Sequence, residues 1–87
     1  MRAGGGVGEL IERIRVMAAK ACDVDPARLS VDGKLLGYGL DSVRALDLIV
    51  DLEAAFGIEI PPHDEALAKL QTVRLLAEYV ARRVHER

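Results

Sequence analysis

The stretch that decides the fold runs from residue 39 to residue 61 and reads GLDSVRALDLIVDLEAAFGIEIP. Its middle predicts a helix from Asp41 or Ser42 to about Phe56, because apolar residues recur there every three or four positions. Asp41 is a residue type that often caps a helix N-terminus, and Gly57 can adopt the left-handed conformation that ends a helix. We therefore expect a helix of about four turns, followed by a short extended link that its prolines keep from being helical.

A helical wheel divides this predicted helix into an apolar face and a charged stripe. The residues expected in the core are Leu46, Ile49, Leu52 and Phe56. The charged stripe consists of Arg44, Asp47 and Asp51. Its apolar border consists of Val43, Val50 and Ala54. Aliphatic groups beside carboxylates suit docking to a basic partner, although burial alone would also explain them.

On the N-terminal side, the three-and-four spacing of apolar residues predicts an amphipathic helix from Val7 to about Cys22. The residues DVDP end it, and Asp25 with the next proline could cap one short helical turn. A long connection follows, from residue 30 to residue 40, with three glycines. We expect three leucines to hold this connection against the core: Leu35, Leu36 and Leu40.

On the C-terminal side, residues 64–70 could form a brief helix, and Thr72 is a good cap for a last helix. The apolar positions of that last helix are Val73, Leu76, Ala77, Val80 and Val84. The sequence thus predicts an all-α bundle of three main helices plus one short helix, a four-helix bundle if the short one is counted. We expect a flexible leader at residues 1–6 and a single domain at residues 7–85.

Composition and charge exclude several classes of function. A chain of 87 residues forms one domain and has little room for a deep catalytic cavity. Its net charge of −2 lacks the basic character of a nucleic-acid binder, and no apolar run approaches the roughly 18 residues that span a membrane. The only cysteine, Cys22, can form no internal disulfide, which suits a reducing cytoplasm. Charge is uneven: the segment 41–60 has five acids against one arginine, whereas the C-terminal tail is basic.

Ser42 lies where the glycine-rich connection becomes a helix, and nothing nearby could activate it as a nucleophile. Catalysis by serine needs a base within hydrogen-bond reach, but the only histidines are His63 and His85, and GLDSV is not the G-x-S-x-G elbow of hydrolases. No two of Cys22, His63 and His85 have the spacing of metal ligands, so we predict no catalytic or metal site. The positive end of the helix would tolerate a phosphate at Ser42, while a plain capping role remains the alternative.

The stretch GLDSVRALDLIVDLEAAFGIEIP resembles the central motif of acyl carrier proteins. Gly39, Asp41, Ser42 and Val43 fall on the G-x-D-S-[LV] signature of that family, and FGIEIP on its usual continuation. LQTVRLLAEYV is similar to the last helix of the family and its capping threonine. The resemblance implies that Ser42 is the attachment point for 4'-phosphopantetheine, placed by a phosphopantetheinyl transferase that uses coenzyme A. Acyl chains would then ride on the terminal thiol as thioesters, and the chain would be a carrier with no catalysis of its own.

The resemblance also makes the second helix the surface that partner enzymes recognise. The partner-binding residues expected on it are Val43, Asp47, Val50, Asp51 and Glu53, with Asp41 serving as helix cap and in transferase recognition. The expected partners are the transferase and the loading, synthase or acyltransferase enzymes with basic docking patches; no nucleic acid and no membrane insertion are expected. The expected pathway is fatty-acid, polyketide or specialised lipid biosynthesis. Arg44 stands where fatty-acid carriers commonly have an acid, which favours a specialised or polyketide-like pathway.

Two alternatives remain open at this point. A carrier of amino acids or peptides would share the fold and the prosthetic arm. An unmodified helical adaptor would use the same patch to bind a partner protein. In each case we expect a cytoplasmic monomer.

Overall fold

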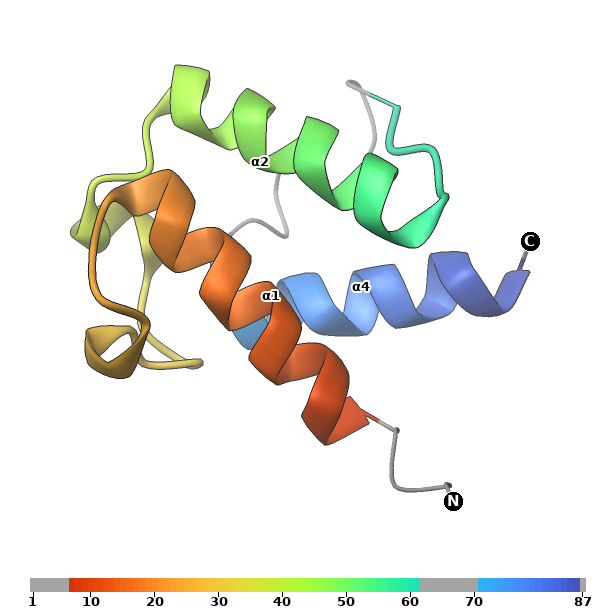
Figure 1. Cartoon of the computed structure of the whole chain (residues 1–87), viewed down its shortest axis with the longest axis horizontal. Helices are drawn as coiled ribbons and strands as arrows, with labels where there is room; N and C mark the ends of the chain where they lie inside the picture. The colour runs from red at the N-terminus through yellow and green to blue at the C-terminus, as the bar shows by residue number, and fades with distance from the viewer. Residues whose placement is uncertain (1–6, 62–70, 87) are drawn as a thin grey trace.

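In a computed structural model, residues 7–61 and 71–86 are described, and they contain three α-helices (Figure 1). The elements in chain order are α1 (Val7–Cys22), the 3-10 turns η2 (Pro26–Arg28) and η3 (Leu35–Tyr38), α2 (Ser42–Phe56) and α4 (Val73–Glu86). Within these two ranges there is no β-strand, which confirms the all-α prediction. Three helices, rather than the four of a four-helix bundle, are present in them. The predicted leader at 1–6 and the predicted short helix at 64–70 lie outside the described residues.

Helix α1 packs against both other helices, and Figure 1 shows the orange α1 beside the green α2 and the blue α4. Its core side includes Ile14, Ala18 and Ala19, which have no exposed surface at all. Two neighbouring alanines let another backbone approach α1 closely, because they add little side-chain bulk. The side of α4 that faces the core is also shielded from solvent, since Val73, Leu76 and Val80 are completely buried. The core is therefore mainly aliphatic, with side chains from all three helices and from the connections between them.

The buried face of α2 differs from the predicted one. Leu48 and Leu52 are fully buried and Ile49 nearly so, whereas Leu46 is 53% exposed. The prediction for Leu46 was therefore wrong, and Leu48 takes the core position. The physical reason is that α2 carries apolar residues on most of its circumference, so its own sequence does not define which half its neighbours cover. At 100° per residue, Leu48, Leu52 and Ile49 share one side of α2, and Leu46 lies beyond its edge.

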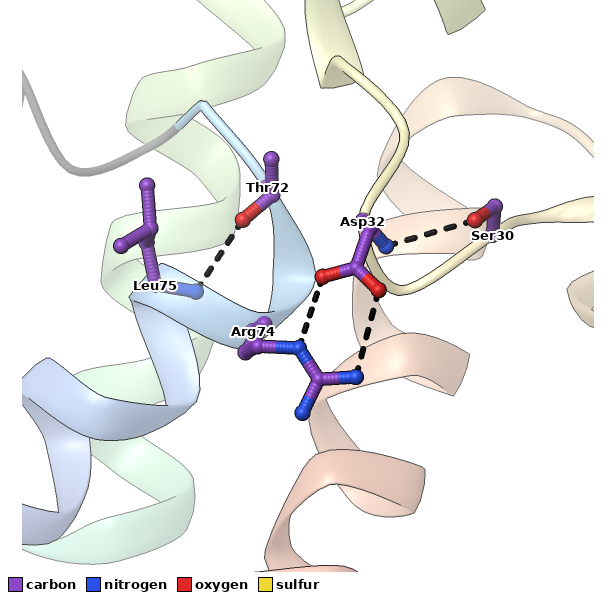
Figure 2. A network of polar contacts seen from close by, with 5 residues as sticks. All are labelled: Ser30, Asp32, Thr72, Arg74 and Leu75. Carbon is purple, nitrogen blue, oxygen red and sulfur yellow. Dashed lines mark hydrogen bonds and ion pairs between the residues drawn. The ribbon is translucent and has the colours of Figure 1, made fainter.

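The helix ends follow local sequence signals. α1 ends with Asp23 in the left-handed region at φ 59°, while the Val24 N–H donates to the Ala19 carbonyl at 2.9 Å. Gly57 ends α2 in the same conformation at φ 64°. The Thr72 hydroxyl accepts the Leu75 N–H at 3.1 Å, which confirms the predicted cap of α4 (Figure 2).

The connection between η2 and α2 is held to the start of α4 (Figure 2). Asp32 accepts two hydrogen bonds from the Arg74 guanidinium, at 2.7 and 3.2 Å. The Leu35 N–H also donates to the Gln71 carbonyl at 2.8 Å. Leu35 and Leu40 are buried as predicted, but Leu36 is 78% exposed and does not anchor the connection. Leu35 and Leu36 are adjacent in η3, and neighbouring side chains of a 3-10 helix point to different sides, so only one of the two faces the core.

Candidate functional site

Ser42 is the first residue of α2, and its side chain is exposed. Its hydroxyl makes no hydrogen bond to any residue within 7–61 or 71–86. Just before it, Leu40 is only 6% exposed, so the chain is anchored to the core two residues from the serine. Gly39 turns the chain there with φ 99°, and its N–H bonds to the carbonyls of Leu35 and Leu36. The serine is therefore displayed at the surface by a backbone that is fixed on both sides.

Asp41 caps α2, as predicted. Its carboxylate accepts the Arg44 N–H at 2.8 Å, and its carbonyl accepts the Ala45 N–H at the same distance. This cap satisfies one of the N–H groups that a helix leaves unpaired at its N-terminus. Because the Asp41 carboxylate forms the cap, the Ser42 hydroxyl is not needed as a capping group. A phosphate on that hydroxyl would meet the positive end of the α2 dipole.

The outer face of α2 has more apolar surface than we expected. Val43 is 69% exposed, Leu46 53% and Val50 60%. We call these three residues the apolar ridge. At 100° per residue they lie within about 60° of one another, on the side of α2 opposite to Leu48 and Leu52. Sequence analysis placed Val43 and Val50 at the border of the patch but assigned Leu46 to the core.

Acidic residues flank the apolar ridge unequally. Asp47 and Asp51 are exposed, as a docking role for them requires. Glu53 is half-buried, and its carboxylate accepts the Ile60 N–H at 2.8 Å. This hydrogen bond directs Glu53 toward the link that follows α2 and reduces its freedom to meet a partner.

A groove of about 510 Å³ separates the carboxyl end of α1 from α2. Its lining residues are Lys20, Ala21, Asp23, Arg44, Asp47, Val50 and Asp51. Arg44 bridges it, donating from Nη1 to the Ala21 carbonyl at 3.4 Å. We call this cavity between the two helices the α1–α2 groove. Sequence analysis did not associate Asp23 or Lys20 with α2, because no local pattern connects residues more than twenty positions apart.

The remaining reactive residues lie away from Ser42 or inside the core. Cys22 is 4% exposed, and burial raises the pKa of its thiol while the nearby Arg44 charge acts in the opposite direction. Cys22 is therefore a small apolar residue of the core. His85 is exposed near the end of α4, and His63 lies outside the described residues. Among the described residues, no three of His, Cys, Asp or Glu come together as metal ligands would.

Comparison with known protein families identifies the chain. The family model described as "Phosphopantetheine attachment site" matches residues 12–80, which include Ser42 and all of α2. The chain belongs to this family. Its cofactor is a covalently attached 4'-phosphopantetheine, and its function is that of a carrier protein.

Relatives of similar length are acyl carrier proteins. The acyl carrier protein of Thermosynechococcus vestitus is 31% identical over 77 residues, which cover 87% of this chain and 93% of the relative. The acyl carrier protein of Campylobacter hominis is 32% identical over 73 residues, covering 83% and 90%. The non-reducing polyketide synthase pkiA of Emericella nidulans is 32% identical over 74 residues, which are 85% of this chain but only 3% of the synthase.

A solved structure supports the same conclusion about the fold. A free-standing peptidyl carrier protein of Acinetobacter baumannii superposes with a TM-score of 0.76 at 34% sequence identity. The match covers 87% of this chain and 92% of the other. The all-α carrier fold predicted from the sequence is thus confirmed, and the peptidyl alternative is no better supported than the acyl one.

The residues around Ser42 fit the cofactor of this family. The hydroxyl is exposed, no described side chain pairs with it, and the neighbouring carboxylate is occupied by the Arg44 N–H. Carrier proteins of this family are not catalysts, and they interact with phosphopantetheinyl transferases and synthase enzymes in general. Within the described ranges, no helix combines the length and the apolar character needed to cross a lipid bilayer.

Proposed function

We propose that this chain carries acyl intermediates on a 4'-phosphopantetheine arm attached to Ser42 and delivers them to biosynthetic enzymes. The observation that supports this most directly is the exposed serine at the start of α2, inside the matched family segment, whose hydroxyl has no partner among the described residues. When bound, the group supplies a terminal thiol that holds acyl chains as thioesters. The tether raises the concentration of the acyl group at each partner's active site, so tight binding of a free acyl chain is not needed.

In this proposal the chain itself performs no catalysis. A carrier needs only to present a hydroxyl where a phosphodiester is electrostatically acceptable, since the transferase supplies the catalytic groups. Asp41 fixes the first turn of α2 through its bond to the Arg44 N–H, and we assign it a part in transferase recognition. His85 lies near the C-terminal end of α4, and among the described residues no histidine lies beside Ser42.

The proposed partner surface is the outer face of α2. Its residues are Val43, Asp47, Val50, Asp51 and Glu53. Exposure of the two aspartates and two valines supports this assignment, whereas Glu53 would contribute less because it is bonded to the Ile60 N–H. The partners are the transferase and acyl-loading, synthase or acyltransferase enzymes with basic docking patches. We propose a monomer in the cytoplasm, a compartment that suits the buried, unpaired Cys22.

Modification with coenzyme A tests the attachment site. The chain has two serines, Ser30 and Ser42, and both are exposed, so Ser30→Ala is a matched control. With a broad-specificity phosphopantetheinyl transferase, the intact mass of the wild type and of Ser30→Ala should rise by one phosphopantetheine. Ser42→Ala should not gain mass. A wild type that stays unmodified would favour the unmodified adaptor, and a modified Ser42→Ala would refute the assignment.

Loading assays then test the cargo. The relatives include acyl carrier proteins, a polyketide synthase and a peptidyl carrier protein, and Arg44 in the first turn of α2 favours a specialised pathway over general fatty-acid synthesis. The modified protein should accept acyl or malonyl groups from their loading enzymes. Exclusive loading by an aminoacyl-loading enzyme would instead make it an aminoacyl or peptidyl carrier.

A further inference from the structure

The connection between η2 and α2 is attached to the start of α4 by its backbone. The Arg74 N–H donates to the Val31 carbonyl at 3.0 Å, and the Leu35 N–H donates to the Gln71 carbonyl at 2.8 Å. The ion pair drawn in Figure 2 joins the same two segments. Because any displacement would break two backbone hydrogen bonds, residues 31–35 are held against α4.

Tyr38 joins this attached segment to the turn before Ser42. It is the last residue of η3, and its hydroxyl accepts the Ser30 N–H at 3.2 Å. Its half-buried ring packs against the core. The next two N–H groups along the chain donate to the Leu35 carbonyl. The two ends of the connection therefore meet at Tyr38, four residues before the serine.

Gly33 lies directly against the ring of Tyr38. A Cβ at this position would lie 2.9 Å from Cε2 of the ring and 3.0 Å from its hydroxyl oxygen, which is closer than van der Waals contact allows. The φ angle of Gly33 is not positive, so the close approach of the ring, and not the backbone conformation, favours glycine here. The tip of the connection is thus folded back onto Tyr38.

We propose that Tyr38 is a positioning residue for the modification of Ser42. Its hydroxyl and ring hold η3 against residues 30–33, and η3 in turn fixes the turn at Gly39 that leads into α2. Tyr38 acts through the backbone and not on the reacting atoms. The inference rests on the proposed carrier function, because it concerns how the serine is presented to the transferase.

Positioning has a kinetic signature that simple stabilisation lacks. If the connection is displaced in a fraction of the folded molecules, the transferase binds only the remainder, so the apparent KM for the carrier rises while kcat stays the same. A loss of global stability has no such effect at a temperature at which the protein stays folded, since unfolded molecules are then rare. The split between KM and kcat therefore distinguishes the two roles of Tyr38.

The kinetic test uses a broad-specificity transferase with saturating coenzyme A, well below the unfolding temperature of each variant. Tyr38→Ala removes the ring and the hydroxyl, and it should raise the KM for the carrier about fivefold with kcat changed less than about twofold. Gly33→Ala should raise the KM in the same way, because its Cβ displaces the ring. Gly37→Ala is the matched control: it has open space for a Cβ and no positive φ, so it should keep the KM of the wild type.

Amide hydrogen exchange reports on the position of the connection itself. Tyr38→Phe keeps the ring and removes only the hydroxyl, so exchange of the Ser30 N–H should become about two- to tenfold faster, the factor expected for the net loss of one hydrogen bond. In Tyr38→Ala and Gly33→Ala, exchange should also become faster at the N–H groups of Gly39 and Leu40. The interior of α1 should keep its wild-type exchange rates in all three variants.

The outcomes separate this inference from the proposed function. If the wild type is modified while Tyr38→Ala and Gly33→Ala have the KM of Gly37→Ala, the inference is wrong and the carrier function stands. The same holds if kcat falls while the KM is unchanged, or if exchange at Gly39 and Leu40 does not respond. Should Tyr38→Ala fail to fold, Gly33→Ala decides alone. A wild type that is not modified overturns both.

Discussion

At the scale of single residues, Gly39 decides how the serine is presented. Its φ of 99° lies in a region that residues with a Cβ rarely adopt, and it comes just before the buried Leu40. Gly39→Ala should lower the free energy of unfolding by about 1–2 kcal/mol, because the backbone must keep this conformation for Leu40 to stay in the core. Urea denaturation measures the change.

Gly37 supplies the control for that substitution. It lies in η3, two residues before Gly39, has no positive φ, and has open space where a Cβ would be. Gly37→Ala should therefore leave stability unchanged or raise it slightly. Equal destabilisation by the two substitutions would mean that the left-handed conformation of Gly39 is not what the fold requires.

Cys22 gives a second prediction at this scale. Its side chain is buried, and burial raises the pKa of the thiol, so both access and ionisation oppose reaction in the folded protein. A thiol-specific disulfide reagent at pH 8 should react slowly with the native protein and rapidly in denaturant. Rapid reaction without denaturant would show that the end of α1 opens readily.

At the scale of elements, α2 presents two leucines with opposite surroundings two positions apart. Leu48 is completely buried and Leu46 is 53% exposed. Leu48→Ala should cost about 2–5 kcal/mol, since it leaves a cavity between helices, whereas Leu46→Ala should cost less than about 1 kcal/mol. Chemical denaturation of the two variants side by side checks this, and comparable losses would contradict the orientation of α2.

The same pair shows what local sequence can and cannot predict. Both ends of α2 and the start of α4 followed from Asp41, Gly57 and Thr72, because caps are local interactions within a few residues. The orientation of α2 depends on where α1 and α4 lie. Apolar residues occupy most of the circumference of α2, so their periodicity predicted the helix but placed Leu46 on the buried face.

At the scale of the whole molecule, the attachment site and its surroundings differ in predictability. Ser42 and its cap belong to one short motif, so the sequence alone indicated them. Asp23 and Asp51 both line the α1–α2 groove, and only the packing of α1 on α2 creates that groove. Charge counts along the chain could not show that the accessible carboxylates lie on one side of an apolar ridge.

The ion pair between Asp32 and Arg74 joins distant parts of the chain and makes stability depend on pH. The hydrogen bond from Arg74 holds the pKa of the Asp32 carboxyl below its ordinary value of about 3.9. The native state therefore releases this proton more readily than the unfolded state, and the resulting stabilisation is present above about pH 4 and is lost as the pH falls through the native pKa. Asp32→Asn should be less stable than the wild type at pH 7, and the difference should shrink below pH 4.

Because both side chains are exposed, the difference in stability between Asp32→Asn and the wild type should be small and should fall with added salt. Thermal unfolding of wild type, Asp32→Asn, Arg74→Gln and the double variant measures the coupling, and a gap that stays constant from pH 7 to pH 3 would exclude this ion pair as its source.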